Sequence, residues 1–243
     1  MNLMRGERSF AAFDIDGTLV RWQLYHSVAD TLSRLGHIDP KLYETIKEAR
    51  MVWKRREGGF PDYERQVVAV YDKVVTSLSR DQFDTAAKAV FVEYKDQVYT
   101  YTRDLIAKLK KDGYLLFAIS GSQTEIVKLI AEYYGFDDYI GSVYEHKDGK
   151  FTGAKVVAAW HKDKALKELV AKHEAGFGGS IAVGDSHSDI KMMKLVEQPV
   201  AFNPERQLFT HAAKNKWKIV VERKNVVYQL ESRDGKYELV KTD

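Results

Sequence analysis

Short apolar runs that stop at polar residues recur along the chain. The first stops at Asp14 and the second at Ser120. Their apolar character is continuous instead of alternating, which is typical of strands buried on both faces and hence of a parallel sheet. The predicted strands are 10–13, 114–119, 181–183, 200–202 and 218–221.

Segments with a helical spacing of apolar residues lie between these strands. They predict helices over 102–111, from Ser122 to about 134, and over 163–173. Ser122-Gln123-Thr124-Glu125 has the pattern of a capping box, and Gly135 fits a helix stop. This alternation predicts an α/β fold with a doubly wound, mostly parallel sheet and helices on both faces.

Residues 21–97 differ from the rest because their pattern predicts no buried strand. A second capping box, Ser79–Gln82, precedes the last of four helical segments there. A helical block directly after the first strand is typical of an inserted cap. We therefore predict an α/β core formed by 1–20 and 98–243, and a helical cap at 21–97. The cap helices are expected at about 24–35, 40–56, 62–77 and 81–97.

Two Asp-Gly pairs predict hairpin turns between apolar stretches. Asp148-Gly149 lies between Val143-Tyr144 and Phe151, and Asp234-Gly235 lies inside the segment 226–241. Two interpretations are open for the second hairpin, which either packs on the sheet edge or forms a contact in a homodimer.

Composition narrows the class of protein. The 243 residues suffice for one core with an insertion, and the absence of cysteine excludes disulfides, thiolate metal sites and cysteine nucleophiles. The net charge of +3 is too small to indicate a nucleic-acid partner. The polar N-terminus and the lack of an apolar run of roughly 18 residues lead us to expect a cytoplasmic protein without a membrane span.

Acidic residues follow two of the predicted strands. Asp14 and Asp16 come after the first, where Gly17 permits a sharp turn, and Asp185 and Asp189 come after the third. The second pair also fits an ordinary helix start, where the helix dipole favours acids. Because open α/β sheets bind ligands at the carboxyl edge, the carboxylates are expected to cluster there. Hard oxygen ligands without cysteine or paired histidines favour Mg²⁺ over zinc.

Ser120-Gly121-Ser122 ends the second strand and precedes a helix. A hydroxyl, free backbone N–H groups and the positive end of a helix dipole form a suitable phosphate site. An ordinary helix N-cap would have the same sequence, so both interpretations stay open on this motif alone.

The ordered set of motifs resembles the haloacid dehalogenase-like (HAD) superfamily. It consists of Asp14-x-Asp16-Gly17-Thr18, Ser120-Gly121, a lysine, and Gly184-Asp185-x-x-x-Asp189. The segment from about 10 to 221 is similar to the phosphoserine-phosphatase-like branch, which carries a helical cap after the first motif. The four motifs together are specific, although none of them is specific alone.

The resemblance implies hydrolysis of a small phosphate monoester. It makes Asp14 the nucleophile, which becomes an aspartyl-phosphate, and Asp16 the general acid and then the general base. It also implies that Ser120 and the backbone near Gly121 and Ser122 hold the phosphate oxygens.

The resemblance also implies a Mg²⁺ site and a lysine. Asp185 would bind Mg²⁺ together with the Asp14 carboxylate and the Asp16 carbonyl, while Asp189 would hold the metal shell or the lysine in place. In this branch the lysine lies four residues before the first leucine of its helix, which selects Lys162. Lys164 is the alternative.

The substrate is not fixed by the motifs. Phosphoserine phosphatases recognise the amino-acid head group with a Glu and an Arg, and the matching positions hold Gln23 and Val70, which argues against phosphoserine. Arg50 and the basic run 54–56 would suit an anionic substrate, but we interpret them as a solvated helix face.

Two other functions stay open beside a phosphatase. The first is a phosphotransferase that passes the same aspartyl-phosphate to an alcohol. The second is a phospholigand-binding protein without turnover. The expected partner in each case is a small phosphorylated metabolite.

Overall fold

A mostly parallel sheet forms the centre of the computed structural model, which describes residues 8–243. Its order is β4-β3-β2-β1-β5-β6-β7-β8-β9, so the chain winds outward from β1 in both directions. Strands β3, β2, β1, β5, β6 and β7 are parallel, and the edge strands β4, β8 and β9 are antiparallel to their neighbours. The predicted fold class is confirmed. The bounds are β1 Ser9–Phe13, β2 Leu115–Gln123, β3 Asp138–Lys147, β4 Lys150–Val156, β5 Gly176–Gly184, β6 Gln198–Phe202, β7 Lys218–Arg223, β8 Val226–Arg233 and β9 Lys236–Thr242.

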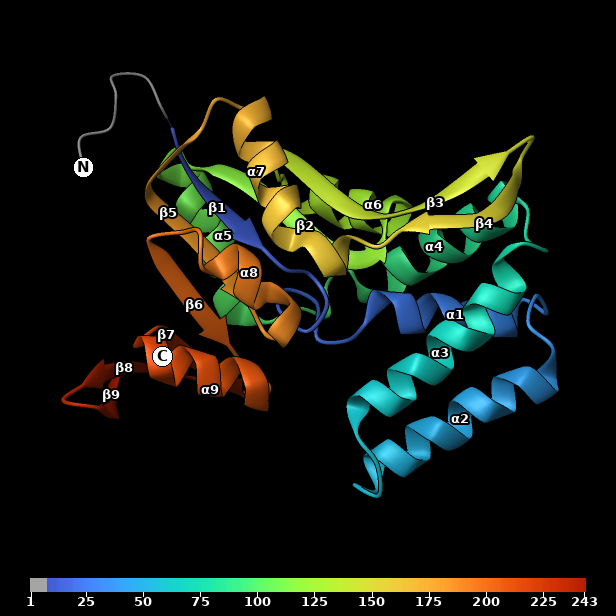
Figure 1. The fold of residues 1–243 in the computed structure, drawn as a ribbon, viewed down its shortest axis with the longest axis horizontal. Coiled ribbons are helices and arrows are strands. Elements are labelled where there is room, and N and C mark those ends of the chain that lie inside the picture. The colour runs from blue at the N-terminus through green and yellow to red at the C-terminus, as the bar shows by residue number, and fades with distance from the viewer. Residues whose placement is uncertain (1–7) are drawn as a thin grey trace.

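Helices cover both faces of this sheet (Figure 1). Side chains alternate along β1, so Phe10 and Ala12 pack on one face, while Ala11 and Phe13 pack on the other. The first face is covered by α7 (Lys162–Lys172), α8 (Ile190–Met193) and α9 (Arg206–Asn215). The second is covered by α5 (Thr100–Lys111) and α6 (Thr124–Tyr134). Within residues 8–243, no helix is both long and apolar enough to cross a membrane.

Four helices follow β1, as the pattern predicts. They are α1 (Leu24–Arg34), α2 (Pro40–Lys54), α3 (Phe60–Val75) and α4 (Arg80–Tyr94). The predicted capping box at the start of α4 is present, with the Ser79 hydroxyl accepting from the Gln82 N–H and the Gln82 side chain accepting from the Ser79 N–H. We use "cap" for residues 21–97, whose status as a separate unit stays a prediction.

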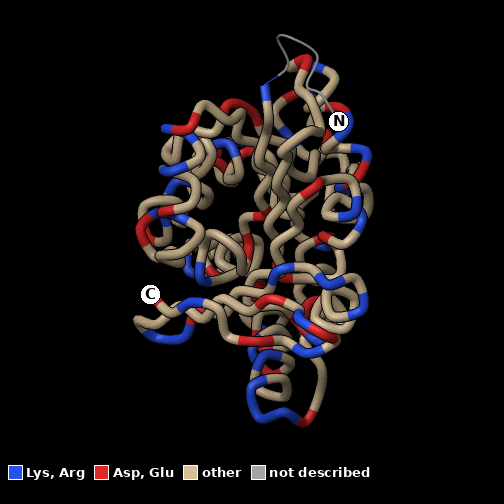
Figure 2. Tube along the Cα trace, turned by 90° about the vertical axis from the view of Figure 1, so that its left-hand side faces the viewer, with Lys and Arg blue, Asp and Glu red and all other residues tan. Residues whose placement is uncertain are grey.

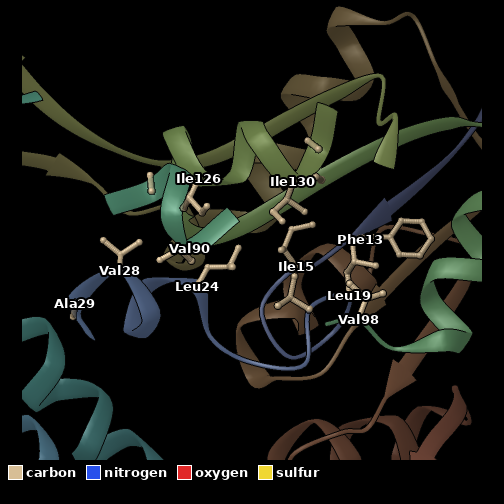
Figure 3. Close-up of a cluster of buried hydrophobic side chains, with 14 of the residues drawn as sticks. Phe13, Ile15, Leu19, Leu24, Val28, Ala29, Val90, Val98, Ile126 and Ile130 are labelled. Atoms are coloured by element: carbon tan, nitrogen blue, oxygen red, sulfur yellow. The ribbon is translucent and has the colours of Figure 1, made fainter. Parts of the chain in front are cut away.

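The cap and the sheet share one apolar core. Figure 3 shows Val28 of α1 and Val90 of α4 beside Ile126 and Ile130 of α6, close to Phe13 of β1. The other two cap helices, α2 and α3, pack on each other (Figure 1), and α3 also reaches the core, where the Tyr71 ring lies 5.6 Å from that of Tyr144 in β3. The apolar contacts of α1 and α4 therefore fix the cap to the core.

The capping box predicted at Ser122–Glu125 is wrong. Strand β2 continues to Gln123, and α6 begins at Thr124 without a side-chain cap. The Ser122 hydroxyl instead donates to Asp16 at 3.0 Å, a bond to a buried carboxylate that the local sequence pattern does not reveal.

The first half of β3 was missed by the pattern. Residues 138–142 pair in parallel with β2, but they are Asp-Tyr-Ile-Gly-Ser and lack a continuous apolar run. The helix stop at Gly135 is confirmed, since this residue adopts a left-handed φ of 71° at the C-cap of α6.

Both predicted hairpins are present. The turn residues Asp148, Gly149, Asp234 and Gly235 have φ of 50°, 76°, 48° and 78°, as a two-residue hairpin turn requires. The C-terminal hairpin of β8 and β9 extends the sheet beyond β7, and the Tyr237 hydroxyl donates to the Trp217 carbonyl at 2.7 Å. It thus packs on the sheet edge, while a homodimer stays a prediction.

The buried His26 of α1 should make stability depend on pH. Its side chain is 1% exposed, its Nδ1 has no partner within residues 8–243, and burial lowers its pKa from 6.5 to about 3. The folded protein therefore keeps a neutral imidazole, while the unfolded chain binds a proton below about pH 6.5. The free energy of unfolding should therefore fall as the pH drops below about 6.5. At about pH 5, His26 alone should account for a loss of about 2 kcal/mol.

Urea unfolding of a His26→Phe variant at about pH 7.5 and pH 5 tests this expectation. The variant should lose less stability on acidification than the wild type. His146→Phe is the matched control, because His146 is exposed. Equal pH dependence in the His26 variant and the wild type would contradict the assignment.

Candidate active site

The carboxyl ends of three adjacent strands bring the predicted motifs together. Strand β1 lies between β2 and β5, and the Asp14 N–H donates to the Val183 carbonyl of β5 at 3.0 Å. Asp14-Asp16 and Asp185-Asp189 directly follow β1 and β5, and Ser120-Ser122 lie among the last residues of β2. Residues far apart in the chain thus face one another at one edge of the sheet, as expected for an open α/β fold.

A buried lysine joins two of the carboxylates. The Nζ of Lys162 lies 2.5 Å from Asp14 Oδ1 and 2.6 Å from Asp189 Oδ1. All three residues are at most 4% exposed, whereas Lys164 lies on the surface. Of the two candidate lysines, the structure places Lys162 in the site.

The second oxygen of Asp189 organises the loop after β5. Its Oδ2 accepts from the N–H groups of Asp185 and Ser186 at 3.1 and 3.0 Å, and from the Ser186 hydroxyl at 3.1 Å. Gly184 is required beneath it, because a Cβ there would lie 2.4 Å from the Asp189 Cγ. Both oxygens of Asp189 are thus occupied by protein donors.

Asp14 and Asp185 form a donor pair suited to a hard cation. Oxygen atoms of Asp14, Asp185 and Asp189 lie within 4.8 Å of one another. Gly17 makes room for this approach, since a Cβ on it would lie 2.2 Å from Asp185 Oδ2 and its φ is 83°. Asp189 accepts four hydrogen bonds, whereas Asp14 accepts one on each oxygen, so lone pairs of Asp14 and Asp185 are left to coordinate. Carboxylate oxygens fit Mg²⁺.

Asp16 is held in a separate group of hydrogen bonds. The Ser120 hydroxyl donates to its Oδ2 at 2.5 Å, and its Oδ1 accepts from the Ser122 hydroxyl at 3.0 Å and from the Leu24 N–H at 2.6 Å. The Ser120 oxygen also accepts from the Ser122 N–H at 2.9 Å. Both serine hydroxyls therefore orient Asp16, an arrangement that the sequence did not predict.

Crowded negative charge marks this site. Burial raises the pKa of Asp14 to about 7, opposed by Lys162 and reinforced by Asp189 and Asp16. Burial also raises the pKa of Asp185, with Asp14 adding to the effect. Burial alone would lower the pKa of Lys162, but Asp14 and Asp189 outweigh it and raise that pKa. Four carboxylates around one ammonium leave an excess negative charge that a divalent cation would relieve.

Burial and hydrogen bonds act in opposite directions on the pKa of Asp16. Burial raises it, while hydrogen bonds from Ser120, the Leu24 N–H and Ser122 lower it, and the net direction is upward. An upward shift favours the protonated carboxyl group, which can donate a proton as acid–base catalysis requires.

Two contacts of the site were missed by the sequence prediction. The Thr18 hydroxyl donates to Asp14 Oδ2 at 2.9 Å. This contact could have been predicted, because Thr18 belongs to the first motif. The hydroxyl of Tyr71 on α3 donates to the Gln123 side-chain oxygen at the end of β2. No pattern in the sequence could have predicted this bond between cap and core, because it joins segments that are distant in the chain.

Comparison with known proteins identifies the family to which the chain belongs. Residues 11–194 match the model of the haloacid dehalogenase-like hydrolases, which is well over half of the chain. The chain belongs to this family. The motifs that carry the resemblance in the sequence are thus those of a true member.

Relatives within the family include phosphoserine phosphatases. One from Albidiferax ferrireducens is 28% identical over 202 residues, covering 79% of this chain and 77% of the relative. One from Mycobacterium tuberculosis is 30% identical over 127 residues, covering 51% of this chain and 41% of the relative. The matches to three mycobacterial relatives thus span about two fifths of their length.

Solved structures share the fold. A substrate-bound phosphoserine phosphatase superposes with a TM-score of 0.63 at 22% identity, covering 91% of this chain and 96% of that one. At this identity the likeness establishes the fold, and the substrate has to be argued from the residues of this chain.

Proposed function

We propose that this chain hydrolyses a small phosphate monoester through an aspartyl-phosphate, with Mg²⁺ as cofactor. The observation that carries the proposal is the placement of Lys162 between Asp14 and Asp189, with Asp185 within reach of the same Asp14 carboxylate. Family membership and the phosphatases among the relatives support it.

In the first half-reaction, an Asp14 oxygen attacks phosphorus, and the bond between phosphorus and the alcohol oxygen breaks. Asp16 gives its proton to the departing alcohol oxygen. In the second half-reaction, water attacks the aspartyl-phosphate while Asp16 takes its proton, which releases inorganic phosphate and restores both carboxyl groups. The bonds from Ser120, Ser122 and the Leu24 N–H keep Asp16 oriented in both steps.

Lys162 offsets negative charge where the substrate phosphate would meet Asp14. Inside a buried site this ammonium acts strongly, because little water screens it. Mg²⁺ would be held by the Asp14 and Asp185 carboxylates and the Asp16 carbonyl, and when bound it supplies further positive charge for the phosphate. Asp189 keeps Lys162 and the Asp185 loop in place through its four hydrogen bonds.

The cap positions argue against phosphoserine as the substrate. Gln23 lies beside the catalytic loop, with its Nε2 3.3 Å from where a Gly17 Cβ would be, but it carries no charge. Val70 is 1% exposed and buried in the apolar core, so it does not reach a ligand. Arg50 is bonded to Asp30 at 2.6 Å, and the exposed basic run 54–56 lies at the end of α2, at the far tip of the cap (Figure 2).

Release of inorganic phosphate tests the proposal directly. The purified full chain should hydrolyse p-nitrophenyl phosphate and members of a phosphorylated-metabolite panel with Mg²⁺. EDTA should lower the rate at least about a hundredfold, and added Mg²⁺ should restore it. A rate that EDTA leaves unchanged would refute the Mg²⁺ dependence. Phosphate transferred to an added alcohol in place of water would show a phosphotransferase.

A further inference from the structure

One face of α3 points at the catalytic end of the sheet. Tyr71 marks this face, because its hydroxyl reaches Gln123 directly after the Ser120–Ser122 segment. The Tyr71 ring lies 4.8 Å from that of Tyr25, whose N–H donates to the Ser122 hydroxyl at 3.1 Å. Glu64 precedes Tyr71 by two helical turns and so lies on the same face, roughly 10 Å further along the helix.

Acidic groups of the core lie opposite Glu64. Burial raises the pKa of Glu64, His187 opposes this, and Asp16 and Glu205 add to it. These three residues come from the loops after β1, β5 and β6, at the end of the sheet that the Tyr71 face of α3 approaches. His187 is itself paired with Glu205, at 3.0 Å. The groups of the core that act on Glu64 are therefore mostly acidic.

Two arginines of the cap are already paired with other carboxylates. Arg65, the next residue, is paired with Asp62, and Arg50 donates to Asp30. A substrate whose alcohol carried a carboxylate would meet Glu64 and Glu205 with a like charge. A substrate with a positive charge would be attracted there.

Aromatic rings form a wall on the same side of the cap. Trp53 lies 6.1 Å from Trp22, 5.1 Å from Phe60 and 5.5 Å from Tyr63. Trp22 directly precedes Gln23, Phe60 lies one turn before Glu64, and Trp22, Trp53 and Phe60 are each partly exposed. His26 packs on Phe60 and Tyr63 within this wall and stays neutral. Exposed aromatic faces beside a carboxylate form a favourable environment for a cation.

We propose that Glu64 and the aromatic wall of Trp22, Trp53 and Phe60 bind the alcohol part of the substrate and select one that carries a cationic nitrogen. The inference rests on the proposed phosphatase function and assigns its substrate class. In this arrangement the recognition carboxylate comes from α3, while the loop position after the first motif holds the uncharged Gln23.

A pair of esters matched in shape isolates the role of charge. Phosphocholine carries a quaternary ammonium, and 3,3-dimethylbutyl phosphate is its neutral analogue. The wild type should favour phosphocholine by about tenfold or more in kcat/KM. Glu64→Gln should reduce that preference at least about fivefold, mainly through a higher KM for phosphocholine, while Glu64→Asp should retain part of it.

Glu44→Gln is the matched control, because Glu44 is an exposed acid on α2 that is paired with Lys47. It should leave the preference unchanged. O-Phosphoethanolamine in the same assay distinguishes a primary from a quaternary ammonium. If the wild type hydrolyses the neutral ester equally well, or if Glu64→Gln keeps the full preference, the cation subsite is refuted while the phosphatase function stands. If neither ester nor p-nitrophenyl phosphate is hydrolysed, both proposals fail.

Discussion

Replacing Asp14 with asparagine should lower turnover of a phosphate monoester by at least about 10⁴-fold, because an amide cannot form the acyl-phosphate bond. Asn has nearly the same shape, and its side-chain oxygen can still accept from Lys162, which now donates to Asp14 Oδ1 at 2.5 Å, while its NH2 group can donate to the Thr18 hydroxyl, which now donates to Asp14 Oδ2 at 2.9 Å. The fold should therefore persist. Steady-state phosphate release and mass spectrometry of acid-quenched protein measure the two expected losses, of turnover and of a phosphorylated species.

Asp112→Asn is the control for this variant, since Asp112 is paired with Lys108 on the surface before the amino end of β2, at the opposite end of that strand from Ser120 and Ser122. Its rate should equal that of the wild type. Should the Asp14 variant release phosphate at the wild-type rate, the aspartyl-phosphate route would have to be abandoned.

Replacing Lys162 with methionine should cost both activity and stability. Methionine fills similar space but leaves Asp14 and Asp189 as buried carboxylates without their shared ammonium, which is 2% exposed. Removing one partner of a buried pair costs about 3–5 kcal/mol of unfolding free energy. Turnover should fall at least about 10³-fold, because the charge that offsets the phosphate is lost.

Lys164→Met separates this effect from a general loss of positive charge. Lys164 is exposed two residues away, so its replacement should change the unfolding free energy by less than about 0.5 kcal/mol. Urea unfolding measures the stability of both variants, and phosphate release in Mg²⁺ measures their activity. An inactive Lys164 variant beside a fully active Lys162 variant would reverse the assignment.

The site residues that the sequence could predict lie at strand ends or at a characteristic spacing. Asp14 and Asp185 follow apolar runs that read as parallel strands, and parallel strands necessarily place their carboxyl ends at one edge. Lys162 followed from its distance to Leu166 within the family pattern. Such features depend on the order and spacing of residues along the chain, which a single sequence displays.

Contacts between distant segments explain what the sequence could not predict. Ser122 fits a helix cap locally, but the Asp16 carboxylate, brought close only by the fold, is a stronger partner. The same holds for Tyr71 and Gln123. The start of β3 was not predicted because Asp138 and Gly141 interrupt its apolar pattern, although residues 138–140 pair in register with β2.

The absence of a side chain at Gly17 couples the evolution of the loop after β1 to that of the loop after β5. Asp185 occupies the space in which any larger residue at position 17 would put its first carbon. A descendant of this protein that acquired a side chain there would have to displace the Asp185 carboxylate and hold a non-glycine residue at a φ of 83°. We thus expect these two positions to diverge together or not at all, although they lie far apart in the chain.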